Sequence, residues 1–120
     1  MWFNLVLPKE YRLPLRKKLN NLKKKGKIFQ GQLFGLLVGL GDKDKNSSFG
    51  FIISNKIHKR ANKRNRARRL LGEAIYSFLP QIKKGYAGVF LAKKGIIEAD
   101  FEKVKKEMKL LLEKAHLLND

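Results

Sequence analysis

The sequence predicts an α+β domain in which helices pack on a small mixed β-sheet, in the element order α-β-β-α-β-α. Three stretches carry apolar residues at helical spacing, and three shorter stretches are rich in aromatic and aliphatic residues. The chain has 120 residues and 43% hydrophobic content, which suits one domain with its own core. We expect a single α/β sandwich domain over residues 13–120, preceded by an extended N-terminal arm over residues 1–12.

Charge and composition limit the classes of protein to which the chain can belong. The formal net charge is +18 and the pI is about 10.4, which favours a partner with densely spaced phosphates. We expect no membrane association, because there is no lipidation motif and the apolar start of the chain ends at Pro8. The chain has no cysteine, which excludes disulfides and thiolate metal sites. We therefore expect a cytoplasmic protein.

The first predicted helix lies between Pro14 and Gly26. Proline suits a first helical turn, because the N–H group that it lacks would have no partner there, and glycine commonly ends a helix. A short apolar stripe between them comprises Leu15, Leu19 and Leu22. Lysine and arginine flank this stripe, so the helix should be amphipathic and basic.

Residues 28–40 have the period-two pattern of a β-strand, interrupted by glycines. One face is bulky enough for a core and comprises Phe34, Leu36, Val38 and Leu40. The other face comprises Leu33, Gly35, Leu37 and Gly39. The two glycines on that face either bring a ligand close to the backbone or mark bulges, and the pattern leaves both alternatives open.

The remaining elements follow from turn and cap signals. The polar loop 41–46 predicts that residues 48–54 form a strand paired antiparallel with the first. A helix should then end near Pro80, and a third strand is expected over residues 85–92. The last helix should begin near Asp100, a good N-cap residue, and bury its apolar stripe in the core.

The stretch from Lys56 to Arg69 is the strongest functional signal. It holds eight lysines and arginines, and no acidic residue occurs between Asp44 and Glu73. Cations at this density repel one another unless water or a polyanion compensates them. Apolar residues at helical spacing begin at Ala67, so the segment should enter a helix whose second half is anchored in the core. A solvated face or a tail is the alternative, but a tail lacks this continuation and solvated helices usually alternate glutamate with lysine.

A helical projection at 100° per residue gives these side chains an orientation. The residues opposite the apolar stripe are Asn62, Asn65, Arg66 and Arg69, with Arg68 at the edge of the stripe. The residues on the side of the stripe, but before it begins, are Arg60, Lys63 and Arg64. The first turns should therefore extend beyond the core and direct cations outward in several directions.

Catalytic patterns are absent from the sequence. His58 and His116 have no carboxylate at a spacing typical of a catalytic dyad, and there is no metal-ligand motif. The glycine-rich stretch 31–41 lacks the Gly-Lys-Ser/Thr ending of a phosphate-binding loop. We expect no catalytic residue and no metal site in the chain itself.

Residues 63–71, Lys-Arg-Asn-Arg-Ala-Arg-Arg-Leu-Leu, resemble the Arg-Asn-Arg signature of the bacterial ribonuclease P protein subunit. The flanking positions that also match are residues 50–56 (Gly-Phe-Ile-Ile-Ser-Asn-Lys), Ala61, Glu73, Gly85 and Tyr86. The resemblance covers about residues 12–118 in the family's element order. It is specific, because a basic helix alone would not bring the flanking strands with it.

The resemblance implies a fold and an activity. The fold would be an α/β sandwich like domain 2 of ribosomal protein S5, with a left-handed crossover that is an exception to the usual handedness. Proteins of this family bind a large catalytic RNA, which removes the 5′ leader of precursor tRNA by endonucleolytic cleavage. The Mg²⁺ ions for this reaction would be bound by the RNA, with no cofactor in the protein. Catalytic RNA and precursor tRNA are thus the implied partners, and no protein partner is implied.

The resemblance also implies contact residues. The residues expected to face the catalytic RNA are Lys56, Lys59, Arg60, Lys63, Arg64, Asn65, Arg66, Arg68 and Arg69. A cleft between the first helix and the sheet would hold the single-stranded leader. The residues expected along this cleft are Leu19, Lys23, Phe34 and Leu37.

Two positions depart from the family's pattern. Leu19 and Lys23 stand where the family often has phenylalanines facing the cleft. Base stacking on an aromatic ring is worth about 1–3 kcal/mol per base, so leader contacts here should depend more on charge and apolar packing. Gly72 stands where an arginine or lysine is usual, which removes a cation and weakens the helix by up to about 1 kcal/mol.

Two other classes fit the composition. A structural RNA-binding protein, such as a ribosomal protein, would have the same charge and would not assist cleavage of precursor tRNA. A free-standing nuclease would cleave RNA without a catalytic RNA, and it would need an acid–base pair that the sequence does not display.

Overall fold

The computed structural model describes residues 7–119, and its elements confirm the predicted α+β fold class. The helices are α1 (Leu15–Lys25), α2 (Ala61–Phe78) and α3 (Phe101–Lys114). The strands are β1 (Lys27–Gln30), β2 (Phe34–Leu40), β3 (Ser48–Ile52) and β4 (Tyr86–Ala92). Short 3-10 turns, η2 (Lys9–Tyr11), η3 (Leu79–Gln81) and η4 (Lys94–Glu98), connect them. The expected arm over residues 1–12 falls partly outside the described residues.

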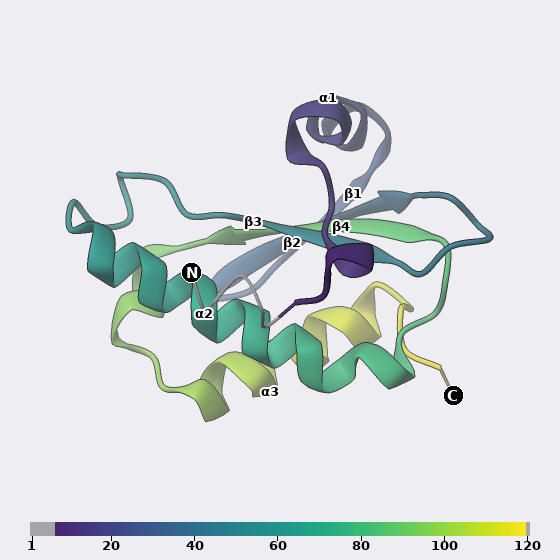
Figure 1. The fold of residues 1–120 in the computed structure, drawn as a ribbon. Helices are drawn as coiled ribbons and strands as arrows, with labels where there is room; N and C mark the ends of the chain where they lie inside the picture. The colour runs from purple at the N-terminus through teal and green to yellow at the C-terminus, as the bar shows by residue number, and fades with distance from the viewer. Residues whose placement is uncertain (1–6, 120) are drawn as a thin grey trace.

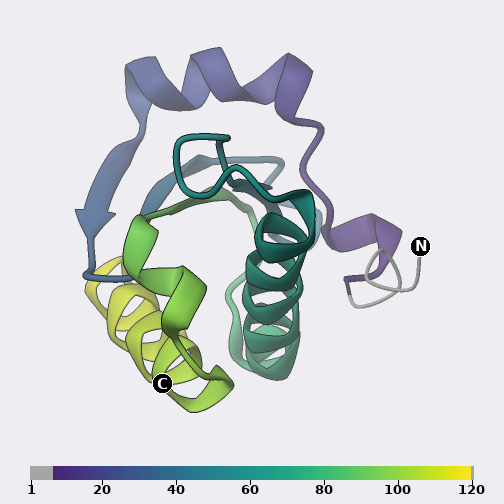
Figure 2. The same cartoon turned by 90° about the vertical axis from the view of Figure 1, so that its left-hand side faces the viewer.

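The sheet has the strand order β1-β2-β4-β3. Both β1–β2 and β2–β4 are antiparallel, whereas β3 runs parallel to β4. The prediction that residues 48–54 pair with the preceding strand was wrong, because β4 lies between β2 and β3. Parallel neighbours need a long crossover, and α2 supplies it. The β3–α2–β4 crossover is left-handed, as Figures 1 and 2 show together.

The predicted strand over residues 28–40 is in fact a hairpin of two strands, which adds one strand to the predicted order. The turn between β1 and β2 is closed by a 3.0 Å hydrogen bond from the N–H of Gly31 to the carbonyl of Phe34. Glu107 of α3 accepts hydrogen bonds from the backbone N–H groups of this turn. A carboxylate from a distant helix therefore fixes the point at which the chain reverses.

The main core lies between the sheet and the layer of α2 and α3 (Figure 1). Phe34 packs edge-on against Phe90 with ring centroids 5.6 Å apart, and Phe49 stacks on Phe90 at 5.8 Å. The predicted core face of β2 is confirmed for Phe34, Leu36 and Val38. Leu40 is the exception, since 82% of its side chain is exposed at the end of the strand.

A smaller core lies between α1 and the opposite face of the sheet. Its buried residues are Leu13, Leu22, Leu37, Ala87 and Val89. A Cβ atom at Gly39 would lie 2.7 Å from Cδ2 of Leu22, and one at Gly26 would lie 2.7 Å from the carbonyl oxygen of Val38. The absence of a side chain at Gly39 therefore lets α1 pack closely on the sheet. The sequence left open a close ligand or a bulge, and this role is neither of the two.

The described part of the N-terminal segment belongs to the domain. Leu7 is buried in the main core, and η2 follows it. Arg12 forms a parallel bridge with Phe49, and the N–H of Leu13 donates to the carbonyl of Phe49 at 2.9 Å. These contacts place residues 7–12 along the outer edge of β3 and lead the chain across to α1.

Candidate nucleic-acid interface

The basic half of α2 starts at a helix end without a side-chain cap. Arg60 is the N-cap residue, and its carbonyl oxygen accepts from the N–H groups of Lys63 (3.2 Å) and Arg64 (3.3 Å). No acidic residue lies in the first turn. The positive end of the helix dipole therefore coincides with a group of cations, and this arrangement favours an external anion.

Local hydrogen bonds hold the loop that leads into α2. The N–H of Ile57 donates to the carbonyl of Ser54 at 3.0 Å. His58 accepts twice: its Nδ1 from the N–H of Arg60 at 3.0 Å, and its carbonyl oxygen from Nη1 of Arg64 at 2.7 Å. The imidazole of His58 thus organises the turn.

The cations nearest to this helix end point into solvent. We call Lys56, Lys59, Arg60 and Lys63 the exposed cation cluster, because all four side chains are exposed. None of these four side chains has a hydrogen bond or an ion pair with any described residue. They are the predicted RNA-facing residues that are freest to bind phosphate.

The arginines further along α2 are only partly exposed and bind the protein's own backbone or a neighbouring amide. Nη1 of Arg66 donates to the carbonyl of Ile97 at 3.2 Å, and Nη2 donates to that of Ala99 at 3.0 Å. Arg68 donates to Oδ1 of Asn65 at 3.0 Å. A guanidinium has five N–H donors, so these bonds leave further donors available. Arg66 and Arg68, like the partly buried Arg69, therefore belong to a rigid second row behind the exposed cation cluster.

The predicted leader cleft is only partly assembled from the expected residues. Leu37 faces α1 and is buried in the smaller core, where Leu19 packs beside it, while Lys23 is exposed on the same helix. The prediction that Phe34 lies along this cleft was wrong, because Phe34 is fully buried in the main core, on the other face of the sheet. Alternation along β2 separates it from Leu37, so it does not line a cleft under α1.

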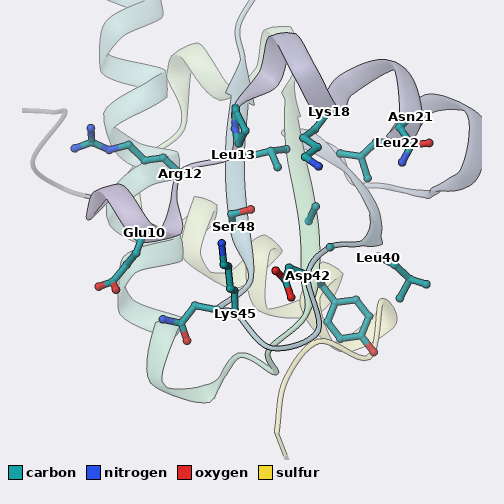
Figure 3. A pocket seen from close by; sticks show the side chains of 15 residues that line it. Glu10, Arg12, Leu13, Lys18, Asn21, Leu22, Leu40, Asp42, Lys45 and Ser48 are labelled. Carbon is teal, nitrogen blue, oxygen red and sulfur yellow. The ribbon is translucent and has the colours of Figure 1, made fainter.

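Two cavities flank α1 on the side of the predicted cleft, but none of the four residues expected along that cleft lines either of them. The smaller, about 200 Å³, is lined by Leu15 of α1, Phe51 of β3 and Arg68 of α2. It connects the start of α1 with the basic helix. The larger, about 550 Å³, lies toward the loop 41–46 and includes Lys18 and Asp42 (Figure 3). Its lining mixes acids with cations, so it lacks the uniform positive charge of the α2 surface.

Metal-ligating side chains do not gather within the described chain. Across residues 7–119, no three histidines or acids lie together in a group that could hold a metal ion. In the same range, no helix is long and apolar enough to cross a membrane. The α2 surface is distinguished by positive charge on a rigid helix.

The fold and this interface define a basic, nucleic-acid-binding α+β protein. The sequence profile of the Ribonuclease P family matches residues 7–116. The ribonuclease P protein component of Microcystis aeruginosa is 34% identical over 116 residues, covering 94% of this chain and 97% of that protein. The corresponding protein of a Synechococcus strain is 33% identical, covering 94% and 87%. The chain belongs to the ribonuclease P protein family.

Solved structures agree with this assignment. The RNase P protein of Thermotoga maritima superposes with a TM-score of 0.76 at 27% identity, covering 86% of this chain and 96% of that one. The RNase P protein of Staphylococcus aureus superposes with a TM-score of 0.80, covering 92% and 100%, and at 19% identity it supports the fold alone. The chain is thus a protein component of an RNA-containing endoribonuclease of tRNA processing.

Proposed function

We propose that this protein binds the catalytic RNA of ribonuclease P through the basic half of α2. The observation that carries the proposal is the exposed cation cluster at the uncapped start of α2. The second half of this helix is held in the core, and Arg66 fixes the side of the helix to the segment before α3. Folded RNA presents phosphates and shape more readily than base edges, and rigid cations suit it. Arg64, Asn65, Arg66, Arg68 and Arg69 would add contacts behind the cluster.

In the same proposal, the single-stranded 5′ leader of precursor tRNA lies along the cleft between α1 and the sheet. Leu19, Lys23 and Leu37 are the expected residues, and the small cavity beside Arg68 supports a path that continues toward α2. The catalytic centre and its Mg²⁺ ions would belong to the RNA. The cleavage would release the mature 5′ end of the tRNA, in the cytoplasm.

The test is reconstitution with the catalytic RNA and a precursor tRNA that carries a leader. The expected result is that the protein enables correct cleavage at a low Mg²⁺ concentration at which the RNA alone is nearly inactive. A structural RNA-binding protein, the alternative reading, would bind RNA without changing the cleavage rate. Cleavage by the protein in the absence of the RNA would indicate a free-standing nuclease instead.

A variant links this assay to the proposed surface. Replacing Lys59, Arg60 and Lys63 with alanine should raise the protein concentration required for half-maximal cleavage. The matched control replaces Lys103, Lys106 and Lys109, which are exposed on α3 and not on α2. Equal effects of the two triple variants would mean that net charge alone, and not the α2 surface, drives assembly.

A further inference from the structure

The solvent side of α1 carries cations without partners in the protein. We define the outer face of α1 as Lys17, Asn20 and Lys24, which are all exposed. They lie opposite the apolar stripe of Leu15, Leu19 and Leu22, of which Leu22 is buried and the other two are partly buried. Neither lysine side chain has a hydrogen bond or an ion pair with any described residue. The two lysines are seven residues apart, which places them about 10 Å from each other along the helix axis, on one side.

The sequence around the outer face of α1 supplies no acidic residue that could neutralise its lysines. No acidic residue occurs between Glu10 and Asp42, and α1 has no acid in its first turn and no side-chain cap. Lys17 lies near the positive end of the helix dipole, where a cation is unfavourable. No acid is available for a stabilising pair three or four residues away. The compensating negative charge must therefore come from outside the chain.

The same protein shows what an ordinary solvated helix looks like. On α3, glutamates at 102, 107 and 113 are interspersed among the lysines at 103, 105, 106, 109 and 114. Its N-terminus is capped by Asp100, whose Oδ1 accepts from the N–H of Lys103 at 2.9 Å. Both helices expose a polar face to water, but of the two only α1 has no acidic residue on that face. Solubility alone does not account for this difference, because α3 achieves it with mixed charges.

The position of α1 indicates which RNA can reach its outer face. α1 lies on one face of the sheet, and α2 and α3 lie on the other (Figures 1 and 2). The loop from β3 into α2, which carries most of the exposed cation cluster, lies at one end of the sheet, so RNA bound there approaches that end of the molecule (Figure 1). By contrast, Lys23, expected in the leader cleft, is the direct neighbour of Lys24 on α1. An RNA strand that leaves the cleft over α1 would pass from Lys23 to Lys24.

We propose that the outer face of α1 binds phosphates of the 5′ leader of precursor tRNA upstream of the segment held in the cleft. This inference rests on the proposed function, because it takes the leader to lie beside Lys23. The face carries no aromatic ring and its polar groups are two ammonium groups and one amide. Contacts there depend on charge and should be independent of the leader's sequence.

The test uses the holoenzyme, reconstituted from the full chain and the catalytic RNA under conditions that prevent cleavage. Affinity is measured for mature tRNA and for precursors whose leaders are lengthened one nucleotide at a time. With the wild type, affinity should continue to rise after the leader has filled the cleft. With the Lys17→Ala/Lys24→Ala variant, the rise should stop earlier, and the log–log salt slope for long leaders should fall by roughly 1.4, or about 0.7 per lost contact.

The controls separate this surface from net charge and from folding. Lys103→Ala/Lys106→Ala removes the same charge from α3 and should leave the length series unchanged. Lys17→Arg/Lys24→Arg keeps both cations and should behave as the wild type. Because all four lysines are exposed, the melting temperatures should stay close to that of the wild type.

Three results would overturn the inference. An equal loss of affinity for mature tRNA would place the body of the tRNA on this face, and a loss of affinity for the catalytic RNA would assign the face to that RNA. If the leader-length series of Lys17→Ala/Lys24→Ala matches that of the α3 control, the outer face of α1 is a solvated surface that does not bind the leader. Failure of the proposed function would look different, because the wild-type protein itself would then give no gain in affinity with any leader.

Discussion

The carboxylate of Glu107 caps the turn between β1 and β2, where its Oε2 accepts a 2.7 Å hydrogen bond from the N–H of Leu33. The same carboxylate accepts from the N–H groups of Gln32 at 2.9 Å and Phe34 at 3.1 Å. One side chain of α3 thus satisfies three backbone donors at the end of a hairpin more than 70 residues earlier in the chain. It locks the strand that lies under α1 to the helix layer on the other side of the sheet.

Removal of this carboxylate should lower stability markedly. Glu107→Ala leaves three N–H groups without their partner, and hydrogen bonds to a charged group contribute about 1.5–3 kcal/mol, so a loss in this range is expected. Glu107→Gln keeps an acceptor oxygen and should lose less. The measurement is the free energy of unfolding from urea denaturation. Glu113→Ala, an exposed position on the same helix, should change it by less than about 0.5 kcal/mol.

Arg66 and Lys63 should separate stability from RNA binding. Arg66→Ala removes two hydrogen bonds to the carbonyls of Ile97 and Ala99, which should cost about 1–3 kcal/mol of unfolding free energy. Lys63→Ala removes an exposed cation and should leave stability within about 0.5 kcal/mol of the wild type. Thermal unfolding and RNA affinity are measured on both variants. A stable Arg66→Ala protein would contradict the structural role of this arginine.

The salt dependence of catalytic-RNA binding should report on the exposed cation cluster. Each phosphate contact contributes roughly 0.7–0.9 to the log–log slope, so Lys59→Ala/Arg60→Ala/Lys63→Ala should reduce the slope by about 2–3. Arg64→Ala/Arg66→Ala/Arg68→Ala should also weaken binding and flatten the slope, but with a loss of stability, because these arginines make hydrogen bonds within the protein. An unchanged slope in the first variant would rule out the cluster as the docking surface.

Glycines under α1 should differ in their tolerance of a side chain. A Cβ atom at Gly26 would lie 2.6 Å from the carbonyl oxygen of Leu22 and 2.7 Å from that of Val38, both of them backbone atoms. At Gly39 the close atom is the end of a leucine side chain, which can move. Gly26→Ala should therefore lose about 1–3 kcal/mol, and Gly39→Ala less. Gly95→Ala, whose nearest atom is 3.4 Å away, is the control for chemical denaturation.

His116 is expected to be a site where stability can be gained. It follows α3 with φ of +58°, a conformation that costs most L-residues roughly 1–2 kcal/mol. The next N–H, that of Leu117, donates to the carbonyl of Leu112 at 3.0 Å, as in a helix ending that favours glycine. His116→Gly should raise the melting temperature, and His116→Val should lower it. A fall in melting temperature with glycine would show that the histidine side chain itself stabilises the ending.

Local signals accounted for most of the elements and for the location of the basic surface. Pro14, Gly26 and Asp100 mark helix ends in the structure as predicted, because caps depend on residues close in sequence. The parallel pairing of β3 with β4 was not predictable in this way, since it joins strands separated by the whole of α2. The hairpin turn was missed for a similar reason: its stabilising partner, Glu107, belongs to the last helix.

The sequence predicted the positive charge of the candidate site, but not which of its cations bind the protein itself and which point into solvent. The sequence identified the cationic segment, yet it did not show that Arg66 binds carbonyls of the segment before α3. For Phe34, the alternation along β2 was read correctly as a core face, and the same alternation should have excluded it from the cleft. The partnerless state of the α1 lysines became visible only once the position of every other side chain was known.

The strand order has a consequence for synthesis of the protein on the ribosome. The central strand β4 is made after β1, β2 and β3, so the two halves of the sheet have no hydrogen-bonded connection until residue 92 has left the exit tunnel. Until then Phe49 and the basic α2 lack the partner strand that holds them together. We expect nascent chains that stop before β4 to be open to proteolysis, and folding to occur in one late step.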